Sequence, residues 1–510
     1  MLQTYQTKIK NSDTSYLDEV SSFFGYIERK LFLDSFVRGE SRTSCKNRYL
    51  KKYNITARQY NSIYINLEGK IKAVLELNKL HLSELEDRIK SIKKFIDTNT
   101  EKKAILHKKV LRLEKTNSFS QKFYKAVKQY RNIKFLLHQK NRKLTNLEQK
   151  LVTLKDDIDS KRIRICFGSK SLLKKQFNLE ENKYASHEDW RKDWINARSS
   201  QYFSVGSKDE SSGNQTCTYN DSGELRIRVA DRFKKRYGKY IVYENIKFPY
   251  GQEFIDNAIR TYMGTTQSGK PAKYVNSAIS YRFNKNKYGW DISATVDRNV
   301  PDIITSTRIG AIGIDMNAGF VNSCEVDRFG NPLKEEKIPL NMYNRSSDQI
   351  TASIGDVVKY IVEKTISTQK PIIIEDLDFS RKKAILGEES KKYSRMLSGF
   401  AYSKFKEMLK ARAVKYGVEV IEVNPAYTSV IGQMKFMKRY GLSSHGSAAC
   451  VIARQGLGFK LEEPKYDSIL GNFRKYISHK PLRSRWASIS FSIKKKHSFN
   501  DRIELLKLDC

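Results

Sequence analysis

Two acidic residues, each at the end of a short apolar segment, are the side chains of this chain best placed to do chemistry. Asp315 follows the apolar run 309–314, and Glu375 follows the three isoleucines at 372–374. An apolar run of this length, bounded by turn residues, is typical of a strand buried on both faces. A carboxylate is costly inside such a sheet, so we expect each acid at a strand end, where it can meet a metal ion or water. Taken singly, each acid would more simply cap the next element, but the pair favours a two-carboxylate metal site.

The segment between the two acids predicts how the strands are connected. Residues 320–326 and 334–340 are expected to form a hairpin around the turn residues 327–332. Residues 346–368 have the apolar period of a helix. The apolar face of this helix is formed by Ile350, Ile354, Val357, Val358, Ile361 and Val362. A hairpin, a crossover helix and a second strand together predict an α/β sheet with both acids at strand ends.

Three segments carry a resemblance to a known family. They read I-G-I-D-M-N at 312–317, I-I-I-E-D-L-D-F at 372–379 and V-N-P-A-Y-T-S at 423–429. These segments resemble the RuvC motifs of transposon-encoded TnpB proteins (the OrfB family), to which the compact type V CRISPR effector nucleases are similar. The resemblance implies an RNase H-like (RuvC) α/β nuclease domain that cuts DNA under the guidance of an RNA. It also implies that Asp315 and Glu375 are the first and second catalytic, metal-binding acids.

The chain departs from the family pattern at two places. TnpB proteins typically carry a zinc ribbon of cysteine pairs where this chain has residues 430–440, which contain no cysteine. The six cysteines are scattered without C-x-x-C pairs, so we expect ordinary reduced thiols and no zinc. The third motif usually reads D-x-N-A-A, and here residues 445–449 read H-G-S-A-A. The resemblance therefore places His445 at the third catalytic and metal-binding position.

The residues around His445 predict how it would reach the acids. Ser443 or Ser444 can cap a helix running to about Gln455, and the small alanines Ala448 and Ala449 would let this helix lie close to the sheet. The alternative is a buried histidine hydrogen-bonded to a backbone carbonyl, with no metal. A helix N-terminus keeps the imidazole neutral, the form that binds metal. The expected cofactor is Mg²⁺ or Mn²⁺, and a site with one imidazole favours Mn²⁺.

The composition indicates a polyanionic partner. The 510 residues include 95 Lys and Arg against 56 Asp and Glu, a formal net charge of +39. Such a charge repels itself unless a polyanion is present, so nucleic acid is expected and a membrane surface is the rival. No apolar run reaches the length of a spanning helix and no signal peptide opens the chain. We therefore expect a cytoplasmic protein of a prokaryotic cell, associated with the nucleoid, whose partners are a guide RNA and double-stranded DNA.

The spacing of apolar residues changes from helix-like to strand-like along the chain, and these changes predict its divisions. Residues 60–160 read as antiparallel helices, with Thr56 as the N-cap of the first, a break near 97–100 and Lys-rich outer faces. A solvated Lys face is the simpler explanation for any one lysine, and contact with nucleic acid is favoured for the array. Strand-like alternation then predicts a small β-barrel. The alternating segments are 162–168, 201–205, 225–229, 278–283 and 290–296, interrupted by a helix at 187–198.

With the resemblance, these divisions become domains. The expected domains are the first strand of a wedge domain at 1–14, a helical recognition lobe at 15–160, a β-barrel wedge domain at 161–305, the nuclease domain at 306–460 with a lid at 380–398, and an irregular basic tail at 461–510. The candidate nucleic-acid contacts are Arg58, Gln59, Lys382, Lys383, Lys404, Arg412, Tyr427 and Arg454.

The function predicted from the resemblance is an RNA-guided, metal-dependent DNA endonuclease that hydrolyses phosphodiesters at one RuvC site with two metal ions. Two alternatives stay open. One is an RNA-guided DNA-binding protein with a weak or dead nuclease, and the other is a guide-independent transposase or resolvase.

Overall fold

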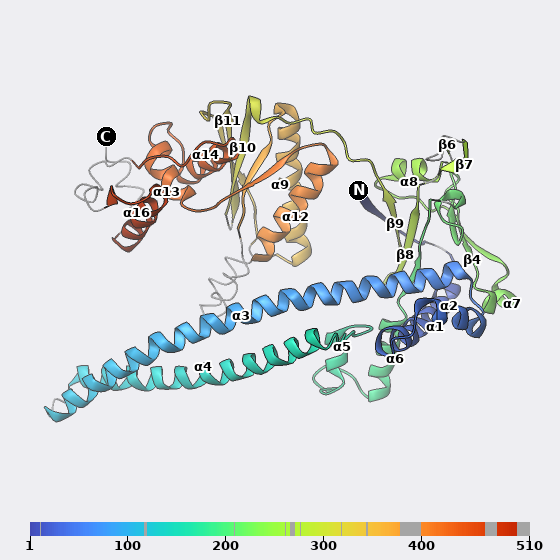
Figure 1. Cartoon of the computed structure of the whole chain (residues 1–510), viewed down its shortest axis with the longest axis horizontal. Helices are drawn as coiled ribbons and strands as arrows, with labels where there is room; N and C mark the ends of the chain where they lie inside the picture. The colour runs from blue at the N-terminus through green and yellow to red at the C-terminus, as the bar shows by residue number, and fades with distance from the viewer. Residues whose placement is uncertain are drawn as a thin grey trace. The chain divides into compact units, whose positions relative to one another are not determined.

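The chain divides between Asn299 and Val300 into two units. The computed structural model describes residues 1–10, 12–116, 120–208, 210–260, 262–265, 271–275, 277–317, 319–342, 345–377, 399–464 and 477–496. Both units mix helices with sheets, and the helical content is large (Figure 1). The predicted lid at 380–398 and part of the predicted tail lie outside the described residues.

The second unit contains a five-stranded sheet of order β12-β11-β10-β13-β14. Its strands are β10 (Gly310–Met316), β11 (Phe320–Asp327), β12 (Pro332–Pro339), β13 (Ile372–Glu375) and β14 (Val420–Val423). The first three strands are antiparallel neighbours, whereas β13 runs parallel to both β10 and β14. The predicted hairpin and the predicted second strand are confirmed.

Helices cover both faces of this sheet because both faces of its central strands are apolar. Ile312 and Ile314 of β10 share a core with α9 (Ser347–Thr368) and α12 (Gly399–Lys415). Ala311, on the opposite face of β10, packs in a second core with α14 (Ser444–Gly456). Figure 1 shows α9 and α12 on one side of β10 and α14 on the other. The predicted crossover helix is confirmed as α9, which begins at a capping box formed by Ser346 and Gln349.

Two features of the second unit differ from the prediction. Ile304 donates its backbone N–H to the carbonyl of Gly417 at 2.8 Å, so residues before the predicted boundary at 306 belong to this unit. The tail was expected to be irregular, but it contains α16 (Leu482–Lys496). This helix forms because Trp486 and Ile489, both 0 % exposed, are buried in the core on the α14 face. The remaining helices are the short η4 (Thr307–Ile309), α13 (Thr428–Gly432) and the π-helix η5 (Gln433–Met437).

The strands of the first unit form separate sheets. A four-stranded sheet has the order β1-β9-β8-β2, a three-stranded sheet the order β3-β4-β5, and β6 pairs with β7. The bounds are β1 (Leu2–Lys8), β2 (Gln201–Ser204), β3 (Cys217–Tyr219), β4 (Leu225–Arg228), β5 (Tyr240–Tyr243), β6 (Tyr262–Thr265), β7 (Pro271–Val275), β8 (Ile279–Asn286) and β9 (Gly289–Asp297). Among the described strands no ladder closes into the predicted barrel. The predicted strand at 162–168 is wrong, because this segment makes no ladder hydrogen bonds.

Long helices dominate the rest of the first unit. The helices are α1 (Ser15–Leu31), η1 (Phe32–Val37), α2 (Arg42–Tyr53), α3 (Ala57–Lys115), α4 (Gln121–Asp159), α5 (Lys170–Lys175), α6 (His187–Arg198), η2 (Ser211–Gly213), η3 (Asp231–Phe233), α7 (Lys234–Tyr237) and α8 (Gln252–Ile259). Thr56 caps α3 as predicted. The predicted break near 97–100 is wrong, because Thr98 and Asn99 donate their side chains to carbonyls four residues back and leave the helix intact. The α3 and α4 helices pack through Ile89, Ile92 and Leu147.

Candidate active site

The two predicted acids lie at the same edge of the five-stranded sheet. The parallel strands β10 and β13 pair in register up to Ile314 and Ile374, so the next residues, Asp315 and Glu375, are neighbours across the ladder. Adjacent strands lie about 4.8 Å apart in a sheet. Because side chains alternate along a strand, both acids are on the face that carries Ile373, which packs against α14.

The helix α14 brings His445 to this edge. Its N-cap is Ser443, whose hydroxyl accepts a hydrogen bond from the N–H of Gly446 at 3.0 Å. His445 lies in the first turn, with Nδ1 3.0 Å from Oδ2 of Asp315. The ring of Phe320 meets the imidazole edge-on, with centroids 5.0 Å apart. The predicted approach of His445 to Asp315 is therefore present in the structure.

A glycine permits this close approach. A Cβ at Gly313 would lie 2.0 Å from the carbonyl oxygen of Ala449 and 2.6 Å from the amide nitrogen of Ala453. Any side chain larger than hydrogen at this position of β10 would push α14 away from the sheet. The small residues of α14 thus have the packing role that the sequence indicated.

Each acid has a further polar neighbour. Asn317 donates its side-chain amide to Oδ2 of Asp315 at 2.9 Å, the same oxygen that faces His445. Thr428, the first residue of α13, donates its hydroxyl to Oε1 of Glu375 at 2.6 Å. These two contacts orient the carboxylates towards the edge of the sheet.

The pKa of the half-buried Tyr402 reflects the negative charge of the site. Tyr402 of α12 donates its hydroxyl to the backbone carbonyl of Glu375 at 2.5 Å. Burial raises the pKa of the Tyr402 phenol, and the negative charges of Glu375, Glu422, Asp376 and Asp315 raise it further. The phenol therefore stays protonated, and the surrounding field favours a cation.

Two of these four acids have lysine partners. Lys406 lies 3.0 Å from Asp376 and 2.7 Å from Glu422, and Lys410 also pairs with Glu422. Burial raises the pKa of Glu422, but the hydrogen bonds and charges of Lys406 and Lys410 outweigh it and lower the pKa overall. The charges of Asp376 and Glu422 are thus offset on the α12 side of the edge.

The donor types at the edge suit a hard divalent cation, since carboxylates bind Mg²⁺ and Mn²⁺ and Mn²⁺ also accepts imidazole. The arrangement is nevertheless not that of a finished ligand set. Within the described part of the chain, no three His, Cys, Asp or Glu side chains are grouped as they would be around a metal ion. For a cation to bind between His445 and Asp315, their contact would have to open.

Some residues of the site carried little or no signal in the sequence. Glu335 of β12 accepts hydrogen bonds from the Ser443 N–H at 2.9 Å and from Asn322 at 3.0 Å, and also pairs with the Ser443 hydroxyl. It thereby fixes the first turn of α14. This role follows from the register of β12 against β11, which the sequence does not show. Thr428 lies inside the V-N-P-A-Y-T-S segment, so that motif could have pointed to it.

The candidate nucleic-acid contacts are dispersed. Gln59 is 1 % exposed and completes the capping box of α3, and this burial argues against its predicted contact with nucleic acid. Arg454 is also used internally, donating to the carbonyl of Gly330 at 2.8 Å and pairing with Glu462 at 2.6 Å. Tyr427 caps α13 in a left-handed conformation, with φ 69°.

The other candidates lie on helices or outside the described residues. Arg58 pairs with Glu210, and Lys404 lies 3.3 Å from Glu407. Arg412 lies 3.9 Å from Glu363. Lys382 and Lys383 lie outside the described residues. The structure thus brings Asp315, Glu375 and His445 to one edge of the sheet.

Two further findings concern the whole described chain. Its five described cysteines are free thiols, and the hydrogen bond between Cys324 and Cys450, followed by burial, raises the pKa of the Cys324 thiol. No helix of the described residues is long and apolar enough to cross a membrane.

Comparison with known proteins gives distant structural similarities. No protein-family model matches the chain, and no curated protein matches it. A CRISPR-Cas12f ternary complex solved by cryo-EM is similar with a TM-score of 0.20 and 11 % identity, over 88 % of this chain and 98 % of that chain. The Cas12i1 R-loop complex after target DNA cleavage has a TM-score of 0.21 and 11 % identity, over 90 % of this chain and 54 % of that chain. The same complex before cleavage has a TM-score of 0.20 at 11 % identity, over 91 % and 54 %. TM-scores this low carry no argument about function, which is therefore inferred from the residues of the chain itself.

Proposed function

We propose that this chain is an RNA-guided, divalent-metal-dependent DNA endonuclease of the TnpB type, with a single RuvC-like site in its second unit. The observation that carries the proposal is the meeting of three predicted residues at one sheet edge. Asp315 and Glu375 are neighbours at the ends of parallel strands, and His445 lies 3.0 Å from Asp315. Their order along the chain is also that of the RuvC motifs they resemble.

The three residues would hold Mg²⁺ or Mn²⁺. When bound, the ions would supply a hydroxide nucleophile near neutral pH and stabilise the leaving 3′ oxygen of the phosphodiester. The protein's own contribution is orientation. The hydrogen bond from Asn317 orients the Asp315 carboxylate, and that from Thr428 orients the Glu375 carboxylate. The helix α14 holds the His445 imidazole beside Asp315.

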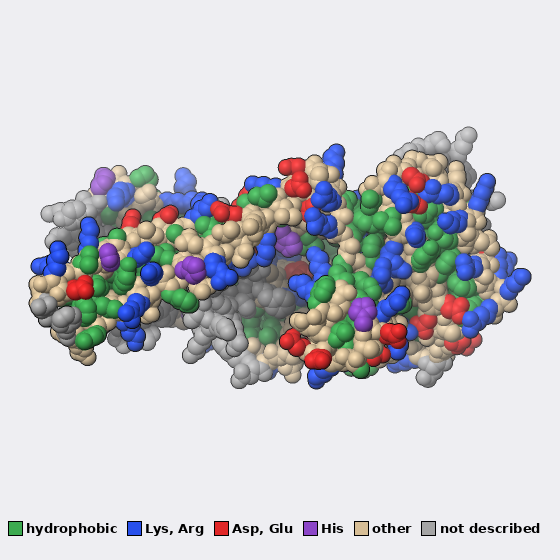
Figure 2. Space-filling view, turned by 90° about the horizontal axis from the view of Figure 1, so that it is seen from below, with side chains coloured by type: hydrophobic (Ala, Val, Ile, Leu, Met, Phe, Trp, Pro, Cys, Tyr) green, Lys and Arg blue, Asp and Glu red, His purple; other side chains and the backbone are tan. Residues whose placement is uncertain are grey.

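The charge of the chain supports nucleic-acid partners. With a formal net charge of +39, the chain can neutralise many phosphates of a guide RNA and a DNA target. Figure 2 shows Lys and Arg side chains spread over the visible face, with Asp and Glu among them. A distribution of this kind suits contact with the phosphate backbone, whereas base pairing with a guide would supply the sequence specificity.

A second candidate is an RNA-guided DNA-binding protein whose nuclease is weak or inactive. It is favoured by the hydrogen bond between His445 and Asp315, which engages the carboxylate oxygen that a metal would need. This candidate predicts guided binding with no cutting in either metal. A guide-independent transposase would cut transposon ends without RNA.

The direct test of the proposal is to purify the chain from cells that carry its native genomic surroundings and to sequence any RNA bound to it. We expect one RNA of defined sequence with a variable segment that matches DNA. Recovery of only random cellular RNA, in amounts that high salt removes, would contradict the guided function.

A further inference from the structure

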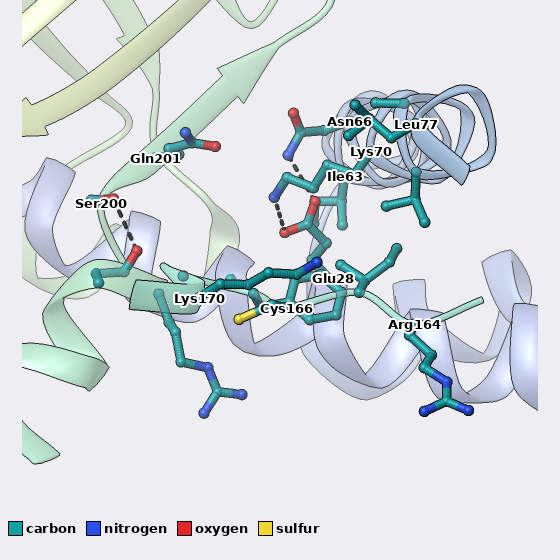
Figure 3. Close-up of a pocket in the computed structure, with 18 of the residues that line it drawn as sticks. Glu28, Ile63, Asn66, Lys70, Leu77, Arg164, Cys166, Lys170, Ser200 and Gln201 are labelled. Atoms are coloured by element: carbon teal, nitrogen blue, oxygen red, sulfur yellow. Dashed lines mark hydrogen bonds and ion pairs between the residues drawn. The ribbon is translucent and has the colours of Figure 1, made fainter. Parts of the chain in front are cut away.

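A cavity of about 590 Å³ lies in the first unit, far along the chain from the acids of the candidate nuclease site. It is lined by parts of α1, α3 and β2, by the ends of α4 and α6, and by the segment 162–170 (Figure 3). Ligand sites in proteins commonly have volumes of about 300–1,000 Å³. The size therefore suits a small organic group and not a lone ion.

One part of the cavity wall is apolar. The apolar lining includes Phe24, Ile63, Val74, Leu77, Phe167 and Phe203. Leu77 is 50 % exposed although it lies beside these buried and half-buried side chains. Because Leu77 lines the cavity, an aromatic group bound there would cover part of its apolar surface.

The other part of the wall is cationic. Five Lys and Arg side chains line the cavity against two acids, which leaves three net positive charges. The five are Lys70, Arg162, Arg164, Lys170 and Arg198, and the two acids are Glu28 and Asp157. Glu28 pairs with Lys70 and accepts from Asn66, each at 2.7 Å, and Asp157 pairs with Arg164 at 2.8 Å. Because both acids already have partners, the cavity is unsuited to a metal cation.

Two of the cations keep donor capacity for a ligand. Within the described part of the chain, the Lys170 amine and the Arg198 guanidinium, which both line the cavity, form no ion pair or hydrogen bond. Figure 3 shows the Lys170 side chain extended among the residues that line the cavity, whereas Arg164 points away from the other labelled residues. An anionic ligand could pair with such cations through charge-assisted hydrogen bonds.

We infer that this cavity binds a nucleoside phosphate, with the aromatic base against the apolar wall and the phosphate between Lys170 and Arg198. Gln201, which faces Asn66 across the cavity in Figure 3, offers an amide donor and acceptor to the edge of a base. Stacking of a base on aromatic and apolar side chains needs no particular sequence. The source is a single unpaired nucleotide of a bound RNA or a free mononucleotide, and both present the same chemistry. The inference concerns a site separate from the proposed nuclease and adds a specific contact to its RNA partner.

Two matched pairs of variants test the site. Lys170→Ala removes a cavity cation, and Lys174→Ala removes an exposed lysine from the same helix that does not line the cavity. Leu77→Trp fills the cavity, and Leu80→Trp adds the same bulk at a position that is 61 % exposed and also outside the lining. All four positions are solvent-exposed, so folding should be retained in each.

The measurement is ultraviolet crosslinking of the full-length chain to its co-purified RNA, followed by mass spectrometry of the crosslinked peptides. A second arm measures binding of radiolabelled AMP and UMP. We expect a crosslink within residues 162–170 or 201–203, or saturable mononucleotide binding, reduced at least about 5-fold by Lys170→Ala and Leu77→Trp but unchanged in the two controls. The crosslink would identify RNA as the source, and mononucleotide binding a free nucleotide.

Equal effects of each variant and its control would overturn the inference, because they would show only general electrostatic binding. Absence of both the crosslink and mononucleotide binding would overturn it as well. Neither arm requires DNA cutting, and Asp315→Ala protein can be used throughout. A chain that crosslinks here and cuts no DNA would contradict only the proposed nuclease.

Discussion

The contact between His445 and Asp315 is the residue-scale feature on which the chemistry depends. Nδ1 of His445 and the amide of Asn317 both meet the same carboxylate oxygen of Asp315. A cation bound by Asp315 must compete with these hydrogen bonds, and an imidazole in place of a carboxylate removes one negative charge from the ligands. In the proposed site, the exchange of carboxylate for imidazole would weaken binding of Mg²⁺ more than that of Mn²⁺.

The first prediction concerns the two acids. Asp315→Ala or Glu375→Gln should abolish detectable cutting, because each removes a strand-end carboxylate from the metal ligands. Guided DNA binding should persist, since the neighbouring partners of these acids are internal. Plasmid cleavage and filter binding on the same preparations would check this. A parallel loss of binding would mean that the acids are structural.

The second prediction concerns His445. The parent should cut slowly in Mg²⁺ and faster in Mn²⁺, and His445→Ala should lose activity. His445→Asp should keep the parental activity or raise it, because aspartate restores the negative charge that Mg²⁺ prefers. Cleavage rates in the two metals across the three proteins would test this. If His445→Ala cuts at the parental rate in both metals, the imidazole is not a ligand.

At the scale of elements, the sequence was informative where packing is local or two-sided. The apolar runs ending in Asp315 and Glu375, and the capped helix carrying His445, predicted correctly that these residues meet. The role of Glu335 was not predictable, because it depends on the register of β12 against β11. Polar residues at 97–100 suggested a break, yet their side chains bond back to the helix. The spacing of residue types does not show whether such side chains bond to the backbone of their own helix or to solvent.

The third prediction concerns the close approach of α14 to β10. Gly313→Ala places a Cβ against the backbone of α14, so we expect a loss of stability of about 1–3 kcal/mol, as for other overpacked cores. The displaced helix should also carry His445 away from Asp315 and lower the cutting rate. Urea unfolding followed by circular dichroism would measure the change in stability.

Gly319→Ala is the matched control for this prediction, because among the described residues no atom lies within 4 Å of a Cβ at that position. Equal stabilities of the two variants would contradict the close packing of α14 on β10.

The fourth prediction concerns Glu335 as a positioning residue. Glu335→Ala removes the acceptor of the Ser443 N–H and hydroxyl, so the first turn of α14 and with it His445 should lose its fixed place. We expect the Mn²⁺ concentration needed for half-maximal cutting to rise roughly 10- to 100-fold, the usual loss of metal affinity when a group that orients a ligand is removed. The Mn²⁺ concentration that gives half-maximal cutting would be measured.

The adjacent residue supplies the control. Glu336 faces the other side of β12, where it pairs with Lys364 at 3.0 Å and with Tyr360. Glu336→Ala should therefore leave the Mn²⁺ requirement unchanged. The same shift in both variants would indicate general weakening of the strand and not positioning of His445.

At the scale of the whole molecule, the proposed nuclease site and the proposed nucleotide-binding cavity lie in different units. The second unit carries the acids and His445, and the first carries the long helices and the cavity between α1, α3 and the segment 162–170. Composition predicted a polyanionic partner, since it depends only on counting charges. It could not predict the cavity, which is built from segments more than one hundred residues apart. Nor could it predict which strands pair within each sheet of the first unit, because strand pairing joins distant segments.

The measurement that tests the central claim most directly is programmed cutting by the purified protein–RNA complex. The variable segment of the bound RNA is replaced by a chosen sequence, and plasmids with and without its match are incubated with Mg²⁺ or Mn²⁺. The account predicts that only the matched plasmid is cut, that Mn²⁺ accelerates cutting, and that Asp315→Ala abolishes it. Cutting that does not depend on the RNA, or no cutting in either metal by the parent and by His445→Asp, would contradict it.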